Sequence, residues 1–179
     1  MRDRQVLHLA RTALFVAAGV VIPQFFHLLG LGAVFLPMFI PVMLGSMFLP
    51  LPLAGVLALV TPVLSWSITG MPPLMPPILP VVTLELLVVA VVISGLHYHR
   101  GVSPIAVLLL AIIADRLLLW LIVRWLAPAL GWTHPIFSLS LVFSGIPGIV
   151  LQLLVIPAAV HFIKQRVNGI PHSAVEWED

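Results

Sequence analysis

The sequence predicts an all-α integral membrane protein, a bundle of six transmembrane helices with both termini in the cytoplasm. Of its 179 residues, 61% are hydrophobic and only 8% are charged, whereas soluble domains carry about 25% charged residues. A membrane span needs about 20 mostly apolar residues. Six segments approach that length, at about residues 9–29, 34–50, 53–69, 78–98, 104–127 and 139–163. We expect all six to be helices, because a segment in hydrocarbon must satisfy its own backbone hydrogen bonds.

The distribution of Lys and Arg predicts the orientation. Those outside the apolar segments lie before or at the start of the first, between the fourth and fifth, and after the sixth: Arg2, Arg4, Arg11, Arg100, Lys164 and Arg166. The other three connections, around residues 30–33, 70–77 and 128–138, contain no Lys or Arg. Cytoplasmic loops carry the excess of Lys and Arg, so both termini are predicted to lie inside.

Residues 1–167 are predicted to form one membrane domain, followed by a polar cytoplasmic tail, residues 168–179. The alternative for the first ~25 residues is a cleaved signal peptide, but Pro23 and Gln24 stand where a small-residue cleavage site belongs. The absence of cysteine excludes a disulfide framework, a thiolate metal site and a thiol nucleophile. The net charge of +2 does not indicate a nucleic-acid partner.

Proline and glycine interrupt the stretch from Leu36 to Pro77 every few residues. In membrane transporters, hydrophobic segments interrupted in this way point to a binding site. The stretch ends in a proline-dense connection, which we expect to form a lid that includes Gly70, Met71, Pro72 and Pro73. Its prolines limit the freedom of the free loop and so reduce the ordering cost of closing over a ligand.

Four ionisable residues lie inside the predicted spans: Glu85, Asp115, Arg116 and Arg124. Such residues are costly in a membrane and usually functional. Arg116, Trp120 and Arg124 are spaced i, i+4, i+8 and so share one helix face. With Glu85 they would line an outward-facing cavity, where Arg recognises a carboxylate or phosphate and Trp120 stacks on a ring. The alternative is that the charges form ion pairs that only join the helices. We favour this alternative for Asp115 and Arg116, and we favour cavity lining for Arg124 and Glu85.

Other candidate binding residues lie at the outer ends of the spans: Ser65, Thr69, Ser144, His27, Trp132 and His134. Each has a simpler alternative. Ser and Thr satisfy themselves on helix backbones, and aromatic residues gather at membrane interfaces without binding anything. Their shared depth is the observation that favours a common site.

Enzyme motifs are absent: the sequence has no HExxH, GxSxG or P-loop pattern. His97 and His99 would need further ligands to hold a metal, so no metal or cofactor is expected. In the first span, Ala13 and Ala17 make a small-residue face where another helix can approach closely. That face either packs inside the bundle or docks a partner membrane protein.

Several of these motifs occur together in one family. They are Arg11-Thr12-Ala13 with Ala17, LPMFIPV from Leu36, TPVLS from Thr61, TGMPP from Thr69, Glu85, and GIPGIVLQ from Gly145 with Pro157. In this order and spacing, over about residues 10–165, the chain resembles the substrate-binding S component of energy-coupling factor (ECF) vitamin transporters.

The resemblance implies a prokaryotic plasma-membrane protein that binds a vitamin or related micronutrient from the outer side, under lids after the first and third spans. Ala13 and Ala17 would face the transmembrane coupling protein of a module with two ATPases, so the chain itself would be no enzyme. Metal-transporting relatives place a histidine beside the N-terminus, whereas this chain begins Met1-Arg2-Asp3. We therefore expect an organic ligand with an anionic or ring-bearing part, such as pantothenate or a pyridoxine-like ring.

Two other functions stay open. An intramembrane enzyme would need Glu85 and Asp115 to face one water-filled cavity. A ligand-free accessory or scaffold subunit would fill the same space with packed side chains.

Overall fold

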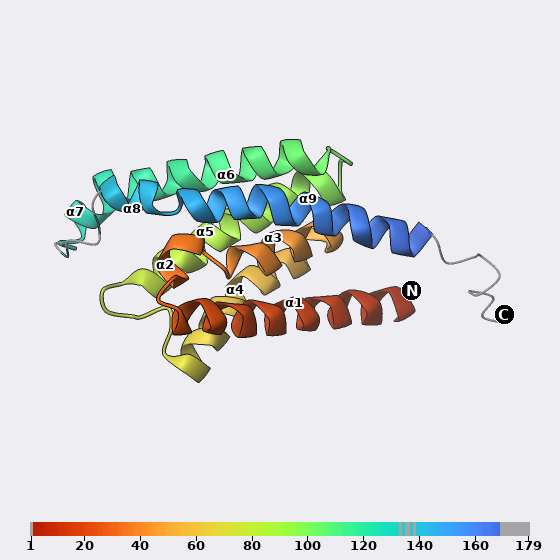
Figure 1. The fold of residues 1–179 in the computed structure, drawn as a ribbon, viewed down its shortest axis with the longest axis horizontal. Helices are drawn as coiled ribbons and strands as arrows, with labels where there is room; N and C mark the ends of the chain where they lie inside the picture. Colours follow the sequence, from red (N-terminus) through yellow and green to blue (C-terminus); the bar gives the residue numbers. More distant parts are fainter. Residues whose placement is uncertain (1, 133, 135–136, 138, 169–179) are drawn as a thin grey trace.

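The computed structural model describes residues 2–132, 134, 137 and 139–168. Over these residues the chain is a bundle of helices (Figure 1), and five helices are long and apolar enough to cross a membrane. They are α1 (Arg2–Leu28), α4 (Leu51–Thr69), α5 (Ile78–Ile93) continued by η1 (Ser94–Tyr98), α6 (Pro104–Leu121) continued by η2 (Ile122–Leu126) and α7 (Ala127–Ala129), and α9 (Ile146–Asn168). The prediction of a helical membrane protein is thereby confirmed.

The second predicted span is shorter than the sequence suggested. Residues 34–50 divide into α2 (Gly32–Phe35) and α3 (Phe39–Phe48), separated by Leu36 in the left-handed region at φ 48°. Pro37 follows, and a proline disfavours the α conformation in the residue before it. The ten residues of α3 rise about 15 Å, half the thickness of the hydrocarbon core.

The short helix α3 lies inside the bundle and is almost entirely buried. Phe39, Val42 and Met43 are at most 2% exposed, and they share one apolar core with residues of α4, α5, α6 and α9. Gly45 allows this close packing, since a Cβ there would lie 2.7 Å from Leu57 and 2.8 Å from Phe15. A helix enclosed by protein has no need to match the thickness of the membrane.

The last predicted span, residues 139–163, is also divided. The short helix α8 (Leu139–Ser144) and α9 are separated by Gly145. The helix α9 continues to Asn168, so the predicted tail, 168–179, otherwise lies outside the described residues.

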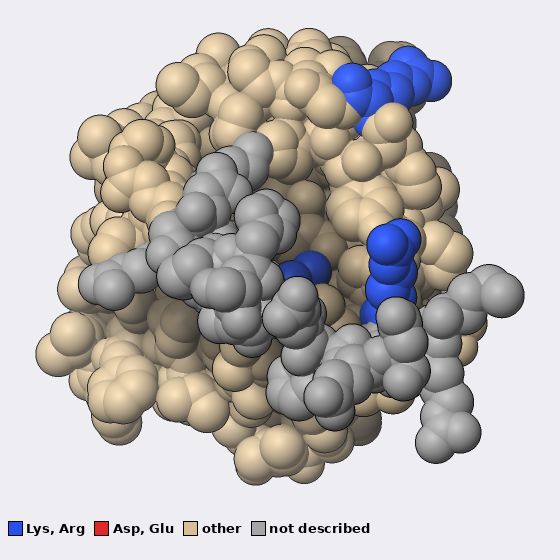
Figure 2. Space-filling view, turned by 90° about the vertical axis from the view of Figure 1, so that its right-hand side faces the viewer, with Lys and Arg blue, Asp and Glu red and all other residues tan. Residues whose placement is uncertain are grey.

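The first turns of α1 and the last turns of α9 lie at the same end of the bundle (Figure 1). The turn after η1 is there too, because the His8 and Tyr98 rings lie 6.2 Å apart, edge to face. Figure 2 looks on to this end, where Lys and Arg side chains of described residues are visible. Arg4 lies near the start of α1 and Arg100 follows η1, so both lie at this end of the bundle.

Candidate functional site

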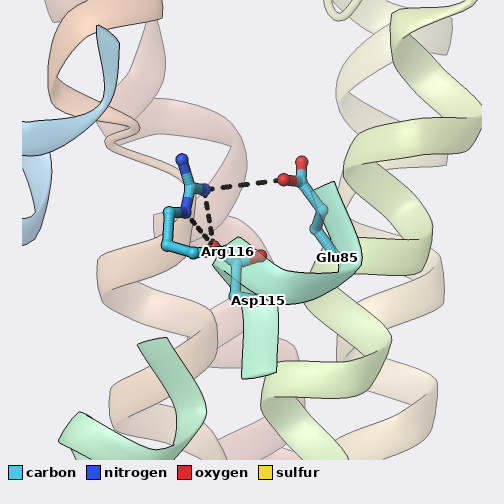
Figure 3. Close-up of polar contacts among 3 residues, drawn as sticks. All are labelled: Glu85, Asp115 and Arg116. Atoms are coloured by element: carbon cyan, nitrogen blue, oxygen red, sulfur yellow. Dashed lines mark hydrogen bonds and ion pairs between the residues drawn. The ribbon is translucent and has the colours of Figure 1, made fainter. Parts of the chain in front are cut away.

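Three charged side chains meet in the interior of the bundle (Figure 3). Glu85 comes from α5, and Asp115 and Arg116 come from α6. Arg116 Nε and Nη2 both donate to Asp115 Oδ2, at 2.9 and 2.5 Å. Arg116 Nη2 also lies 3.5 Å from Glu85 Oε1. We call these three residues the charged triad.

The helical periodicity explains why both carboxylates are buried. Asp115 lies one turn from Ala111 and Leu119, which are core residues, and is itself 3% exposed. Glu85 lies one turn from Val81 and Val89 and is 4% exposed. The side chain of Arg116 is 17% exposed. The triad is thus held on the facing sides of α5 and α6.

The triad is not balanced as a structural ion pair would be. Two carboxylates face one guanidinium, so the three groups sum to one negative charge when all are ionised. Glu85 Oε1 and Asp115 Oδ1 are buried, and no described residue donates a hydrogen bond to either. An unsatisfied buried polar group costs about 1–3 kcal/mol. The arrangement therefore carries unused hydrogen-bonding capacity at a cost in stability.

Leu36 and the glycines before and within α9 adjoin the triad. A Cβ on Gly145 would lie 3.2 Å from Arg116 Nη1 and 2.8 Å from Leu36 Cδ1. A Cβ on Gly148 would lie 2.6 Å from the backbone oxygen of Phe35. The two glycines therefore let α2 and Leu36 approach α9 beside Arg116. Sequence reasoning did not assign these residues to the site, although the motif from Gly145 and the interruption at Leu36 were the signals.

The rest of the predicted α6 stripe lies nearer the surface. Trp120 is 42% exposed. Arg124 is exposed, and its Cζ lies 5.2 Å from the centroid of the Trp125 ring. Arg124 lies in the π-helical turn η2, whose i→i+5 bonding interrupts the α-helical register on which the predicted i+8 spacing depends. Arg116 therefore pairs with Asp115, the alternative favoured for these two residues, and also with Glu85, whereas Arg124 lies over Trp125.

The polar residues of α4 lie on the side of that helix that faces α1. Gln24 Nε2 lies 3.5 Å from Thr69 Oγ1, which donates to the Ser65 carbonyl at 2.8 Å. Gly19 of α1 lies against the Thr61 side chain, one turn from Ser65. Ser65 Oγ is buried and has no hydrogen-bond partner among the described residues. Ser65 and Thr69 thus share a face with the α1 contact.

Four other predicted binding residues lie near the end of the bundle that carries Thr69. His27 is exposed, and its ring lies against Gly32. The Trp132 ring lies 5.3 Å from that of Phe137 and packs on a second apolar cluster from α5, α6 and η2. His134 is exposed. Ser144 ends α8, and its side chain lies outside the described part of the chain.

The predicted lid is anchored to the helices that it connects. Gly70, at φ 73°, caps α4 and donates to the Trp66 carbonyl at 2.8 Å. The backbone N–H of Leu79 donates to the Pro73 carbonyl at 3.0 Å. Met71 is exposed, and Pro72 and Pro73 are half-buried. The residue that shares a contact at Gly145 with Arg116 is instead Leu36, which the sequence placed in the second predicted span.

Two open grooves on the outside of the bundle are apolar. One, of about 500 Å³, lies between α5 and α6 and includes Leu84, Leu118 and Trp125. The other, of about 420 Å³, lies between α4 and α5 and includes Val63 and Leu79. Neither groove is lined by the triad, and their composition suits lipid chains.

The described residues contain no group of three or more His, Cys, Asp or Glu that could hold a metal ion. Ala13 and Ala17 are exposed on α1, so in this structure their face does not pack inside the bundle. No protein-family model, curated protein or solved structure matches the chain.

Proposed function

We propose that this protein is the membrane-embedded binding subunit of an uptake system for a water-soluble vitamin or related micronutrient, an S component of an ECF transporter. The observation that carries the proposal is the charged triad. Its two buried carboxylates retain acceptor oxygens without a donor, inside a bundle of apolar helices. Ionisable groups at such a depth are usually kept for function.

The proposed orientation places the basic end of the bundle in the cytoplasm of a prokaryote, by the positive-inside rule. The ligand then enters from the opposite end, which carries α2 and the loop from Gly70 to Pro77. Leu36 and the adjoining α2 serve as the cover nearest the triad, because Leu36 lies against Gly145 and Phe35 of α2 lies against Gly148. The loop after α4 closes the neighbouring part of that end.

The proposed energy source is a partner module with a transmembrane coupling protein and two ATPases. The chain offers that partner a smooth face on α1, where Ala13 and Ala17 are exposed near apolar Leu9 and Leu14. Small residues allow another helix to approach closely within a membrane. The chain needs no catalytic residue or cofactor of its own in this role.

The structure offers less support to the other two functions. A scaffold subunit gains nothing from buried carboxylate oxygens that lack donors, because each one lowers stability. An intramembrane enzyme would use Asp115 and Glu85 as acid and base, but Arg116 pairs with both of them. A binding site uses the same atoms without requiring either to transfer a proton.

Affinity purification from the native host tests the proposal. The tagged protein, extracted in mild detergent, is expected to retain one small organic molecule and to co-purify with a coupling protein and two ATPases. The Ala17→Leu variant is the matched control, expected to keep the small molecule and lose the partners. A wild-type preparation that yields neither contradicts the proposed function.

A further inference from the structure

We infer that the molecule bound at the charged triad carries a protonated nitrogen group with two or more N–H donors, such as an ammonium or an amidinium. This inference rests on the function proposed above and names the chemical class of its substrate. The expectation based on sequence was a ligand with an anionic or ring-bearing part, and the inference differs from its anionic alternative.

The site carries an excess of negative charge. Glu85 and Asp115 contribute two negative charges and Arg116 one positive charge, all within direct pairing distance. Glu85 and Asp115 are only 4% and 3% exposed. Water screens charge poorly at such buried positions. A ligand with one positive charge completes the balance, whereas an anionic ligand adds to the excess negative charge.

The side-chain atoms of the triad that have no hydrogen-bond partner are acceptors. Glu85 Oε1 and Asp115 Oδ1 are acceptors, are buried, and receive no hydrogen bond from the described residues. Figure 3 shows the second oxygen of Asp115 on the side that faces Glu85. The two acceptors therefore come from two different helices, α5 and α6. A nitrogen with two or more N–H groups satisfies both, in charge-assisted hydrogen bonds.

The arginines on which an anionic ligand would depend interact with other side chains of the protein. Arg116 already donates two hydrogen bonds to Asp115 and pairs with Glu85. Arg124 is exposed and lies over Trp125. The positive charge of Arg116 is therefore directed at the carboxylates, where it holds them in place for the ligand.

The rival explanation is a proton on one carboxyl group, which neutralises the triad without any ligand. The two explanations differ in what Glu85→Gln does. If Glu85 is a ligand contact, the amide removes an uncompensated charge, so the ligand-free protein becomes as stable as the wild type or more stable, and ligand retention falls. If instead the proton sits on Glu85 and no ligand binds there, the side chain is already neutral, so Glu85→Gln leaves both stability and ligand retention unchanged.

The experiment uses the full-length protein, purified in mild detergent and stripped of bound molecules. The probe is the water-soluble small-molecule extract of the host cells. After equilibration and desalting, retained compounds are released by denaturation and identified by mass spectrometry. Wild type, Glu85→Gln and Glu85→Asp are compared, with Arg100→Gln as a charge-changing control at the opposite end of the bundle.

We expect wild type to retain a compound with a nitrogen protonated at pH 7. Retention should fall about 10- to 100-fold in Glu85→Gln, the range for a charge-assisted hydrogen bond. It should recover partly in Glu85→Asp and stay unchanged in Arg100→Gln. Equal retention by Glu85→Gln overturns the inference.

The class of compound retained by wild type is decisive even if a variant fails to fold. A retained compound without a protonated nitrogen overturns the charge inference and leaves the proposed function standing. A wild-type protein that retains nothing overturns both.

Discussion

Replacement of Arg116 by Gln removes the only positive charge that the described structure places within the triad. The variant loses two hydrogen bonds to Asp115, at 2.9 and 2.5 Å, and the ion pair with Glu85 at 3.5 Å. It leaves two carboxylates that are only 3% and 4% exposed without a counter-charge. Removing one partner of a buried ion pair costs about 3–5 kcal/mol. We expect the free energy of unfolding to fall by that amount.

The measurement is unfolding of the purified protein by sodium dodecyl sulfate in mixed micelles, followed by circular dichroism. The matched control is the triple variant Arg116→Gln/Asp115→Asn/Glu85→Gln, which removes all three charges together. Replacing a whole buried ionic group with neutral residues is often neutral or stabilising, so the triple variant should recover most of the loss. The reasoning is refuted if Arg116→Gln unfolds within about 0.5 kcal/mol of wild type, the range for ordinary surface substitutions.

Three further variants test the surroundings of the triad. Gly148→Ala places a Cβ 2.6 Å from the Phe35 oxygen and should lower the free energy of unfolding by about 1–3 kcal/mol in the same titration. Gly55→Ala is the control, because the nearest neighbour of its Cβ lies at 4.0 Å. An equal loss of stability in the two variants would contradict the contact between α2 and Gly148. Ala17→Leu, on an exposed face, should unfold within about 0.5 kcal/mol of wild type yet block uptake or partner assembly; a large loss of stability would mean internal packing. Arg124→Ala should weaken binding of the co-purifying molecule by less than about 1 kcal/mol, as expected for an exposed charge, whereas a loss of 1–3 kcal/mol would place Arg124 in the site.

Regular apolar segments were predictable from the sequence because the membrane allows them few conformations. Isolated spans must be helical, and five long helices are found where apolar segments occur. The pairing of Arg116 with Asp115 was expected as the alternative to cavity lining, since a charge in a membrane needs a partner. Glu85, which was expected to line the cavity, pairs with Arg116 as well.

The division of the second segment was not predictable by length and hydropathy. Leu36 to Phe48 is as apolar as a span, and the break depends on the local conformation of Leu36 before Pro37. Buried α3 is shielded by its neighbours, so hydropathy does not reveal that it is short.

The sequence could not predict which polar residues lie at the triad and which lie at other helix contacts, for a different reason. Depth along a helix can be counted from a sequence, but the neighbour that each helix face meets depends on tertiary packing. Ser65 and Glu85 are both buried, yet Ser65 lies on the face of α4 that meets α1 and Glu85 pairs with α6. The π-helical turn that interrupts the register between Arg116 and Arg124 also leaves no pattern in residue spacing.

Native mass spectrometry of wild type and Glu85→Gln, purified side by side from the native host, tests the central claim most directly. The claim is that a ligand binds at the buried triad. It predicts a small-molecule adduct on the wild-type protein that is lost from the equally folded variant. A wild-type protein that carries no adduct, or an adduct of equal occupancy on both proteins, would contradict it.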